Sequence, residues 1–239
     1  MRRVGLALAL AASGCVETPA PIDIGGVVYD PERLWLGEPA GVAGAQVYLA
    51  EDDSLGALSG DGGAYLIQDV PANFNWHAIA VDDPVHLRTI DGLGTPITDS
   101  SLAAHFTPIL RRGGLPSVVA AWLGIDVSDV EASGLIVAAV MDGRPPEGRF
   151  LFSELSVSVG GDACAITWGF VTHDGKNFAV AKAPSGTPPE GWTGMLVAVG
   201  PLGCIVTTSI RDLTGQRDYL PHDMPIDNRA VTFQIFVPR

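Results

Sequence analysis

Residues 61–71 read Asp-Gly-Gly-Ala-Tyr-Leu-Ile-Gln-Asp-Val-Pro, a tight turn followed by a strand. Asp-Gly is favoured in tight hairpins because both residues tolerate a positive φ. In the run that follows, Tyr65 and Ile67 lie on one face of a strand, and Leu66 and Gln68 lie on the other. The Val-Pro pair ends the run, because proline has no backbone N–H for a sheet ladder. The stretch therefore predicts one arm of a β-hairpin.

Three more short strand patterns surround this stretch, at residues 24–29, 44–49 and 76–81. In the second of them, alternate residues from Ala45 to Leu49 are apolar and share a face. Turn residues such as Asp-Pro follow the first and the third. Because no helical periodicity separates these strands, we expect them to form a small antiparallel sandwich.

The same segments resemble the carboxypeptidase regulatory-like domain, a transthyretin-like β-sandwich found in many secreted and envelope proteins. The resemblance covers roughly residues 22–83, and its motifs are Ile-Gly-Gly-Val-Val-Tyr at 24–29, Gly-Ala-x-Val at 44–47, Asp-Gly-Gly-Ala-Tyr at 61–65 and Val-Pro at 70–71. It implies folding support, adhesion, or carbohydrate and protein contact, and it carries no catalytic residues to transfer. We therefore expect a first sandwich domain at residues 22–84.

Residues 85–132 differ in character, and we expect a connector with one or two short helices there. Apolar residues recur at helical spacing over 102–110, and the basic pair and glycines at 111–114 are typical of a helix end. Pro116 can open a second helix that ends near Gly124. The segment is either a lid or partner-binding hairpin, or, as we favour, a connector packed against the sandwiches.

A weak internal repeat links the C-terminal part of the chain to the first stretch. Asp174-Gly175 precedes an aromatic residue by four positions and a proline by ten, and Asp61-Gly62 does the same. Tryptophan-led strands follow both copies, at Trp76 and Trp192. We interpret residues 133–239 as a second, diverged sandwich. The expected fold is mainly β: two small antiparallel sandwiches of transthyretin or immunoglobulin type, joined by a short helical connector.

The first fifteen residues have the layout of a secretory signal. Two arginines precede a nine-residue apolar run at 4–12, which is too short to span a bilayer. The ending Ala-Ser-Gly-Cys resembles the lipobox of bacterial lipoproteins, although Ala12 stands where leucine is usual. The resemblance implies that Cys15 is acylated and anchors the chain, with residues 16–21 as a tether. An ordinary cleaved signal with a chance cysteine is the alternative.

The anchor implies a place in the cell envelope. Val16 follows the cysteine, and by the family's sorting rule a residue other than aspartate there is compatible with the outer membrane of a two-membrane host. We therefore expect a lipid-anchored protein of the outer membrane or cell surface.

Two cysteines remain once Cys15 is used by the anchor, namely Cys164 and Cys204. An even pair in an oxidising compartment predicts one disulfide, and two buried free thiols are the alternative. Neither cysteine has the close Cys or His spacing of a zinc site.

Charge and motif content exclude several classes of function. The formal net charge is −13, and the only adjacent basic pair beyond the signal is Arg111-Arg112, which excludes nucleic-acid binding. The five histidines lack metal-ligand spacing, and no serine-hydrolase motif occurs. Acidic groups at 51–53 with Asp61, and at 82–83, could bind calcium, but without an ordered Asp-x-Asp-x-Asp-Gly pattern solvated loop acids are favoured. We expect no cofactor, no metal and no catalytic residue.

Trp35 is the candidate ligand contact, because it lies in an expected loop without an obvious core partner. Its alternative role is to plug the end of the sandwich. The favoured function is a non-enzymatic envelope lipoprotein whose sandwiches contact another envelope protein or give structural support. A carbohydrate-binding module using loop aromatics is the second hypothesis, and a hydrolase with an unrecognised site is the third.

Overall fold

The structure is a computed structural model that describes residues 19–72, 76–143, 149–150, 155–161, 164–182, 186–226 and 230–239. The expected signal and Cys15 lie outside this set, as does Pro184 of the repeat. Within these ranges, no helix is both long and apolar enough to cross a membrane.

The first stretch forms the predicted turn and strand, but the predicted hairpin is wrong, because β3 (Asp52–Leu58) before the turn and the strand after it belong to different sheets. A single 3₁₀ turn, Asp61–Gly63, leads into β4 (Ala64–Val70), and Gly62 and Gly63 have φ of 69° and 82°. Strand β4 pairs antiparallel with β1 (Ile22–Tyr29), and β1 pairs parallel with β7 (Ser101–Pro108). These three strands are one layer of the first sandwich.

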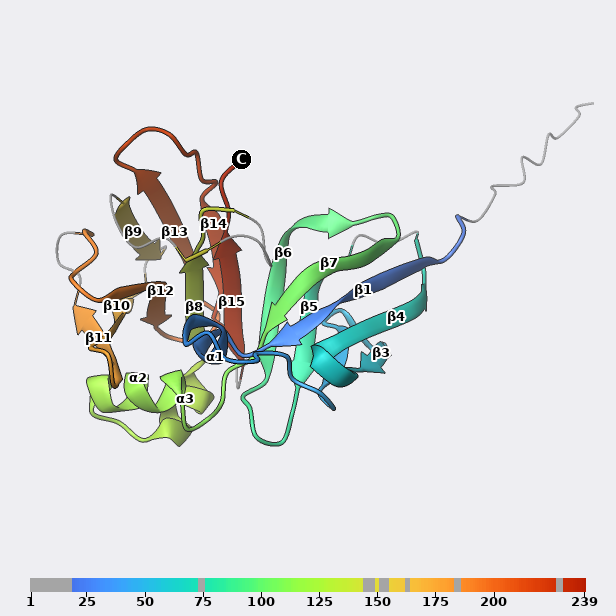
Figure 1. The fold of residues 1–239 in the computed structure, drawn as a ribbon, viewed down its shortest axis with the longest axis horizontal. Helices are drawn as coiled ribbons and strands as arrows, with labels where there is room; N and C mark the ends of the chain where they lie inside the picture. Colours follow the sequence, from blue (N-terminus) through green and yellow to red (C-terminus); the bar gives the residue numbers. More distant parts are fainter. Residues whose placement is uncertain are drawn as a thin grey trace, which may run out of the picture.

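The largest sheet has nine strands and runs through both halves of the molecule (Figure 1). Its strands, in spatial order, are β11 (Phe178–Lys182), β10 (Thr167–His173), β12 (Trp192–Val199), β8 (Leu135–Val140), β15 (Val231–Phe236), β6 (Thr89–Ile97), β5 (Trp76–Asp82), β2 (Gln46–Leu49) and β3 (Asp52–Leu58). Strand β15 is parallel to β8 on one side and to β6 on the other, whereas the remaining pairs are antiparallel. The last strand of the chain therefore joins the two sandwiches.

A third sheet completes the second sandwich, with the order β14 (His222–Pro225), β13 (Ile205–Asp212) and β9 (Leu155–Gly161). The predicted disulfide is confirmed: Cys164 and Cys204 are bonded, with their Cα atoms 6.3 Å apart. Cys204 is buried in the apolar core of this sandwich and Cys164 packs against the same core. The mainly-β, two-sandwich class is thus confirmed, with the added finding that the sandwiches share a sheet.

Three apolar cores hold these layers together. One fills the first sandwich around Val47, Ile67 and Ile79, and the second fills the C-terminal sandwich around Phe170 and Val206. The third lies between the nine-stranded sheet and two helices, α2 (Leu115–Leu123) and α3 (Val127–Ser133), which cover the C-terminal half of the sheet in Figure 1.

The helix expected over 102–110 is wrong, because residues 101–108 form strand β7. The apolar spacing there suits either structure, and the parallel ladder with β1 decides the outcome, since tertiary pairing overrides a local preference. The helix expected from Pro116 is confirmed as α2, which ends at Gly124 with φ of 73°. Residues 89–97 are also a strand, so the segment expected as a connector supplies strands to two sheets.

Candidate functional site

Trp35 does not lie in a loop but ends a short helix, α1 (Pro31–Trp35). Asp30 caps this helix by accepting hydrogen bonds from the backbone N–H groups of Glu32 and Arg33. The indole is half-buried, with its centroid 4.5 Å from that of His173 and 5.5 Å from that of Phe178. Trp35 therefore packs on the β10–β11 hairpin of the second sandwich, and no described feature tests its predicted role as a ligand contact.

Glu32 forms a second link between α1 and the C-terminal half. Its Oε1 accepts a hydrogen bond of 2.5 Å from the backbone N–H of Leu115, at the start of α2. A Cβ on Gly114 would lie 2.3 Å from the same oxygen, so a larger residue there would displace the Glu32 carboxylate. Burial raises the pKa of Glu32 to about 7, the Leu115 N–H opposes that rise, and the charge of Asp30 adds to it.

A polar cleft of about 540 Å³ lies between the β5–β6 connection and helix α3. Its lining comes from strands β2 and β5, the β5–β6 connection, the segment before α2, and α3. The residues are Gln46, Asp82, Asp83, Pro84, His86, Leu87, Arg88, Arg112, Ser128, Glu131 and Ala132. The volume is in the range of small-molecule sites. It is the candidate binding site of this chain.

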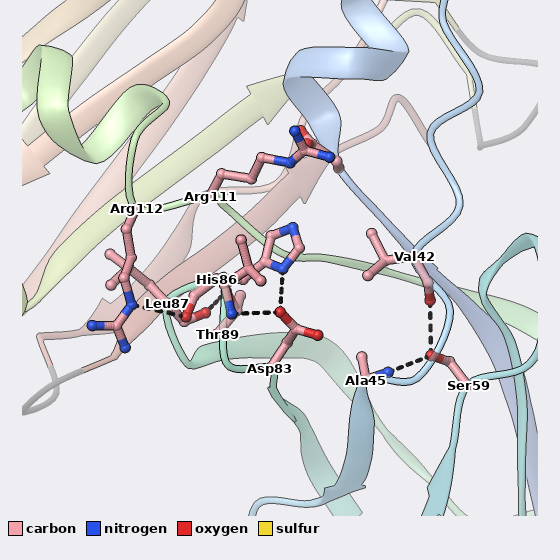
Figure 2. A network of polar contacts seen from close by, with 11 residues as sticks. Val42, Ala45, Ser59, Asp83, His86, Leu87, Thr89, Arg111 and Arg112 are labelled. Carbon is pink, nitrogen blue, oxygen red and sulfur yellow. Dashed lines mark hydrogen bonds and ion pairs between the residues drawn. The ribbon is translucent and has the colours of Figure 1, made fainter.

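An imidazole–carboxylate pair forms one wall of the cleft (Figure 2). His86 Nδ1 lies 2.6 Å from Asp83 Oδ1, and that oxygen also accepts a hydrogen bond of 2.8 Å from the backbone N–H of Val85. Burial alone would raise the pKa of Asp83, but these hydrogen bonds hold it below its usual range. His86 is 5% exposed, and its Nε2 has no hydrogen-bond partner among the described residues.

Arg112 joins this wall to the helix on the other side. Its Nε donates to the carbonyl oxygen of His86 at 3.4 Å, and its Nη1 lies 3.2 Å from Glu131 Oε2. The neighbouring Arg111 turns to the opposite side, where its Nε lies 3.4 Å from Asp30 Oδ2. The basic pair Arg111-Arg112, expected as a helix end, therefore contacts the N-cap of α1, the cleft and α3.

A second hollow of about 510 Å³ adjoins the first and shares Asp82 and Arg88 with it. The Tyr48 hydroxyl donates to Asp82 Oδ2 at 2.5 Å, and Arg88 Cζ lies 5.8 Å from the centroid of the Tyr48 ring. Burial, followed by the hydrogen bond to Asp82, raises the pKa of Tyr48 to about 12. The residues at 51–53 line the outer end of this hollow.

The two acidic groups considered for calcium meet here, because residues 51–53 and Asp82 line the same hollow. Asp61 lies apart from them, on the 3₁₀ turn before β4. In the part of the chain that the structure places, no three His, Cys, Asp or Glu side chains are arranged to hold a metal ion.

Sequence reasoning did not identify Arg88 or the Asp83–His86 pair. The available signal was an Asp-Pro turn with histidine three residues after the aspartate. No nucleophilic side chain among the placed residues hydrogen-bonds to His86 Nε2.

No family model and no curated protein matches the chain. Among solved structures, the shaft pilin SpaA of Lactobacillus rhamnosus GG is 10% identical, with 92% of this chain and 98% of that chain covered at a TM-score of 0.28. A family 26 carbohydrate-binding module from Eubacterium rectale Amy13K, in complex with maltoheptaose, is 9% identical, with 90% and 93% covered and a TM-score of 0.29. These are distant similarities, and no assignment is drawn from them.

Proposed function

We propose that the chain is a non-enzymatic cell-envelope lipoprotein whose two sandwiches act as one rigid body in structural support or protein contact at the membrane surface. The observation that carries the proposal is the position of β15, which pairs with β8 of one half and β6 of the other. A shared ladder resists bending between the halves, because backbone hydrogen bonds must break before the halves can separate.

Two side-chain links reinforce this shared sheet. Trp35 packs on His173 and Phe178, and Glu32 caps the start of α2. Both come from α1, which directly follows the first strand of the first sandwich. Backbone pairing in the shared sheet and these side-chain contacts both oppose movement of one sandwich against the other. A protein that gives structural support needs this rigidity.

The anchor at Cys15 would hold this body close to the membrane. Strand β1 begins at Ile22, and a six-residue tether spans at most about 22 Å when fully extended. A partner on the same membrane would therefore lie within reach of the sandwiches.

The test is chemical cross-linking in the native host, comparing the wild type with Cys15→Ser. We expect the wild type to be in the membrane fraction, to carry acyl chains by mass spectrometry and to capture one envelope protein stoichiometrically. Cys15→Ser should leave the membrane fraction and lose that protein while keeping the same circular dichroism spectrum and melting temperature.

Membrane retention of Cys15→Ser with an unchanged partner would remove the anchor from the proposal. Capture of no protein by the acylated wild type would remove the contact role. Glycan binding through Trp35 loses support, because the indole is committed to the β10–β11 hairpin.

A further inference from the structure

We propose that the two adjoining hollows form one groove that binds a neutral oligosaccharide, with Asp82 and Arg88 at its centre. The inference goes beyond the support role and does not depend on the anchor. It rests on the adjacency of the two hollows, on Arg88, which has no carboxylate partner among the described residues, and on the kind of ligand that suits acids and a base side by side.

The two hollows lie side by side, because Asp82 and Arg88 line both of them. One end is formed by α3 and the other by Glu51 and the first two residues of β3, Asp52 and Asp53. With about 540 Å³ on one side of the shared pair and about 510 Å³ on the other, an extended ligand fits better than a single small molecule.

Most charged groups in the groove already have partners in the protein. Asp83 pairs with His86, Arg112 pairs with Glu131, and Asp82 accepts the Tyr48 hydroxyl. Arg88 differs, because it has no ion pair among the residues described. Its guanidinium lies over the Tyr48 ring, and its Nε is buried with no hydrogen-bond partner in the parts of the chain that the structure describes.

Arg88 is only partly buried and has no carboxylate partner among the described residues, so a ligand oxygen in the groove would gain a charge-assisted hydrogen bond from its guanidinium. The acids around it restrict the choice of ligand. A carboxylate or phosphate would meet Asp82 and residues 51–53 at close range, and an ammonium group would meet Arg88. A hydroxyl group suits both kinds of neighbour, since it donates to a carboxylate and accepts from a guanidinium.

A chain of sugar rings supplies such hydroxyl groups in pairs along its length. An extended peptide fits less well, because it binds by adding a strand to a free sheet edge or by filling apolar pockets. Strands β2 and β5 at the groove are hydrogen-bonded on both sides within the nine-stranded sheet. Strand β3 is the edge of that sheet, but it lines the groove only with Asp52 and Asp53, so polar side chains supply the main contacts.

The test is a binding titration of the full-length chain in a detergent without sugar groups. The probes are neutral oligosaccharides of two to six glucose, mannose, galactose, xylose or N-acetylglucosamine units. Oligogalacturonate and an acidic and a neutral peptide of similar length are included for comparison. We expect at least one neutral oligosaccharide to bind, with the longer members binding more tightly than the disaccharide.

Arg88→Gln should weaken that binding by about tenfold or more, because a charged donor at the centre of the groove is lost. Arg211→Gln is the matched control, since Arg211 is exposed on β13 and does not line either hollow. Asp82→Asn is the second variant, with the same loss expected, and it keeps the inference testable if Arg88→Gln unfolds.

Two results would overturn the inference. One is that no neutral oligosaccharide binds the folded wild type, or that only the acidic oligomer or a peptide does. The other is neutral-sugar binding that both groove variants retain at the strength of the Arg211→Gln control.

Discussion

The indole of Trp35 lies 4.5 Å from the imidazole ring of His173, so a helix beside the first sandwich packs on a hairpin of the second. Phe178 completes the cluster, 5.5 Å from Trp35 and 4.8 Å from His173. Three aromatic rings from distant parts of the sequence therefore hold the two halves together at one end of the nine-stranded sheet.

Trp35→Ala should destabilise the protein by about 2–4 kcal/mol, because it removes a half-buried aromatic side chain and leaves a gap against the hairpin. Chemical denaturation measures the loss. Leu34→Ala is the control, since Leu34 is the adjacent residue of α1 and is 42% exposed, and it should change the free energy of unfolding far less. Equal effects of the two substitutions would contradict the bridging role.

The pKa of Glu32, about 7 in the folded chain against 4.5 for an unperturbed carboxyl, predicts a pH dependence of stability. The folded state binds this proton more tightly than the unfolded state. The stability that the proton supplies is therefore fully present below pH 4.5 and is lost as the pH rises through about 7.

Glu32→Gln should remove this dependence, because the amide stays neutral and its oxygen can still accept from the Leu115 N–H. We expect the variant to match the wild type near pH 4.5 and to be more stable by on the order of 2–3 kcal/mol at pH 8. Denaturation of both proteins between pH 4.5 and 8 measures the difference. A difference that stays constant with pH would show that Glu32 does not titrate in this range.

The disulfide closes a loop of 40 residues within the second sandwich. Replacing both cysteines, Cys164→Ser with Cys204→Ser, should lower the free energy of unfolding by about 3–4 kcal/mol, because the unfolded chain regains loop freedom. Calorimetry measures the melting temperature with and without a reductant. The double variant is the control, because it has no Cys164–Cys204 disulfide to reduce. An unchanged melting temperature on reduction of the wild type would count against it.

Phe233 is fully buried on β15, at the strand that both halves share. Phe233→Ala should destabilise by about 3–5 kcal/mol and should lower the melting of both halves together. Hydrogen exchange can follow each half separately, through the backbone amides of β5 in the first sandwich and of β10 in the second. If only one half lost stability, the proposal of a single rigid body would fail.

Several elements were accessible to sequence reasoning because their signals are local. The alternation after the Asp-Gly turn predicted β4, and the proline and glycine around 116–124 predicted α2. The Cys164–Cys204 pair followed from the count of cysteines and the expected compartment. The helix expected over 102–110 failed because its apolar spacing suits a strand equally well once β1 is beside it.

By itself, the sequence determined the short strands, the turns between them and helix α2, because alternation and turn residues act over a few neighbouring residues. It also determined the disulfide, because only two cysteines remain beyond Cys15. Only the tertiary structure decided that β15 lies between β8 and β6, that Trp35 packs on the second sandwich, and that Asp82 and Arg88 are at the centre of a groove. The physical reason is that parallel pairing and side-chain packing join segments far apart in the chain, and no local pattern encodes which distant partner completes the lowest-energy arrangement.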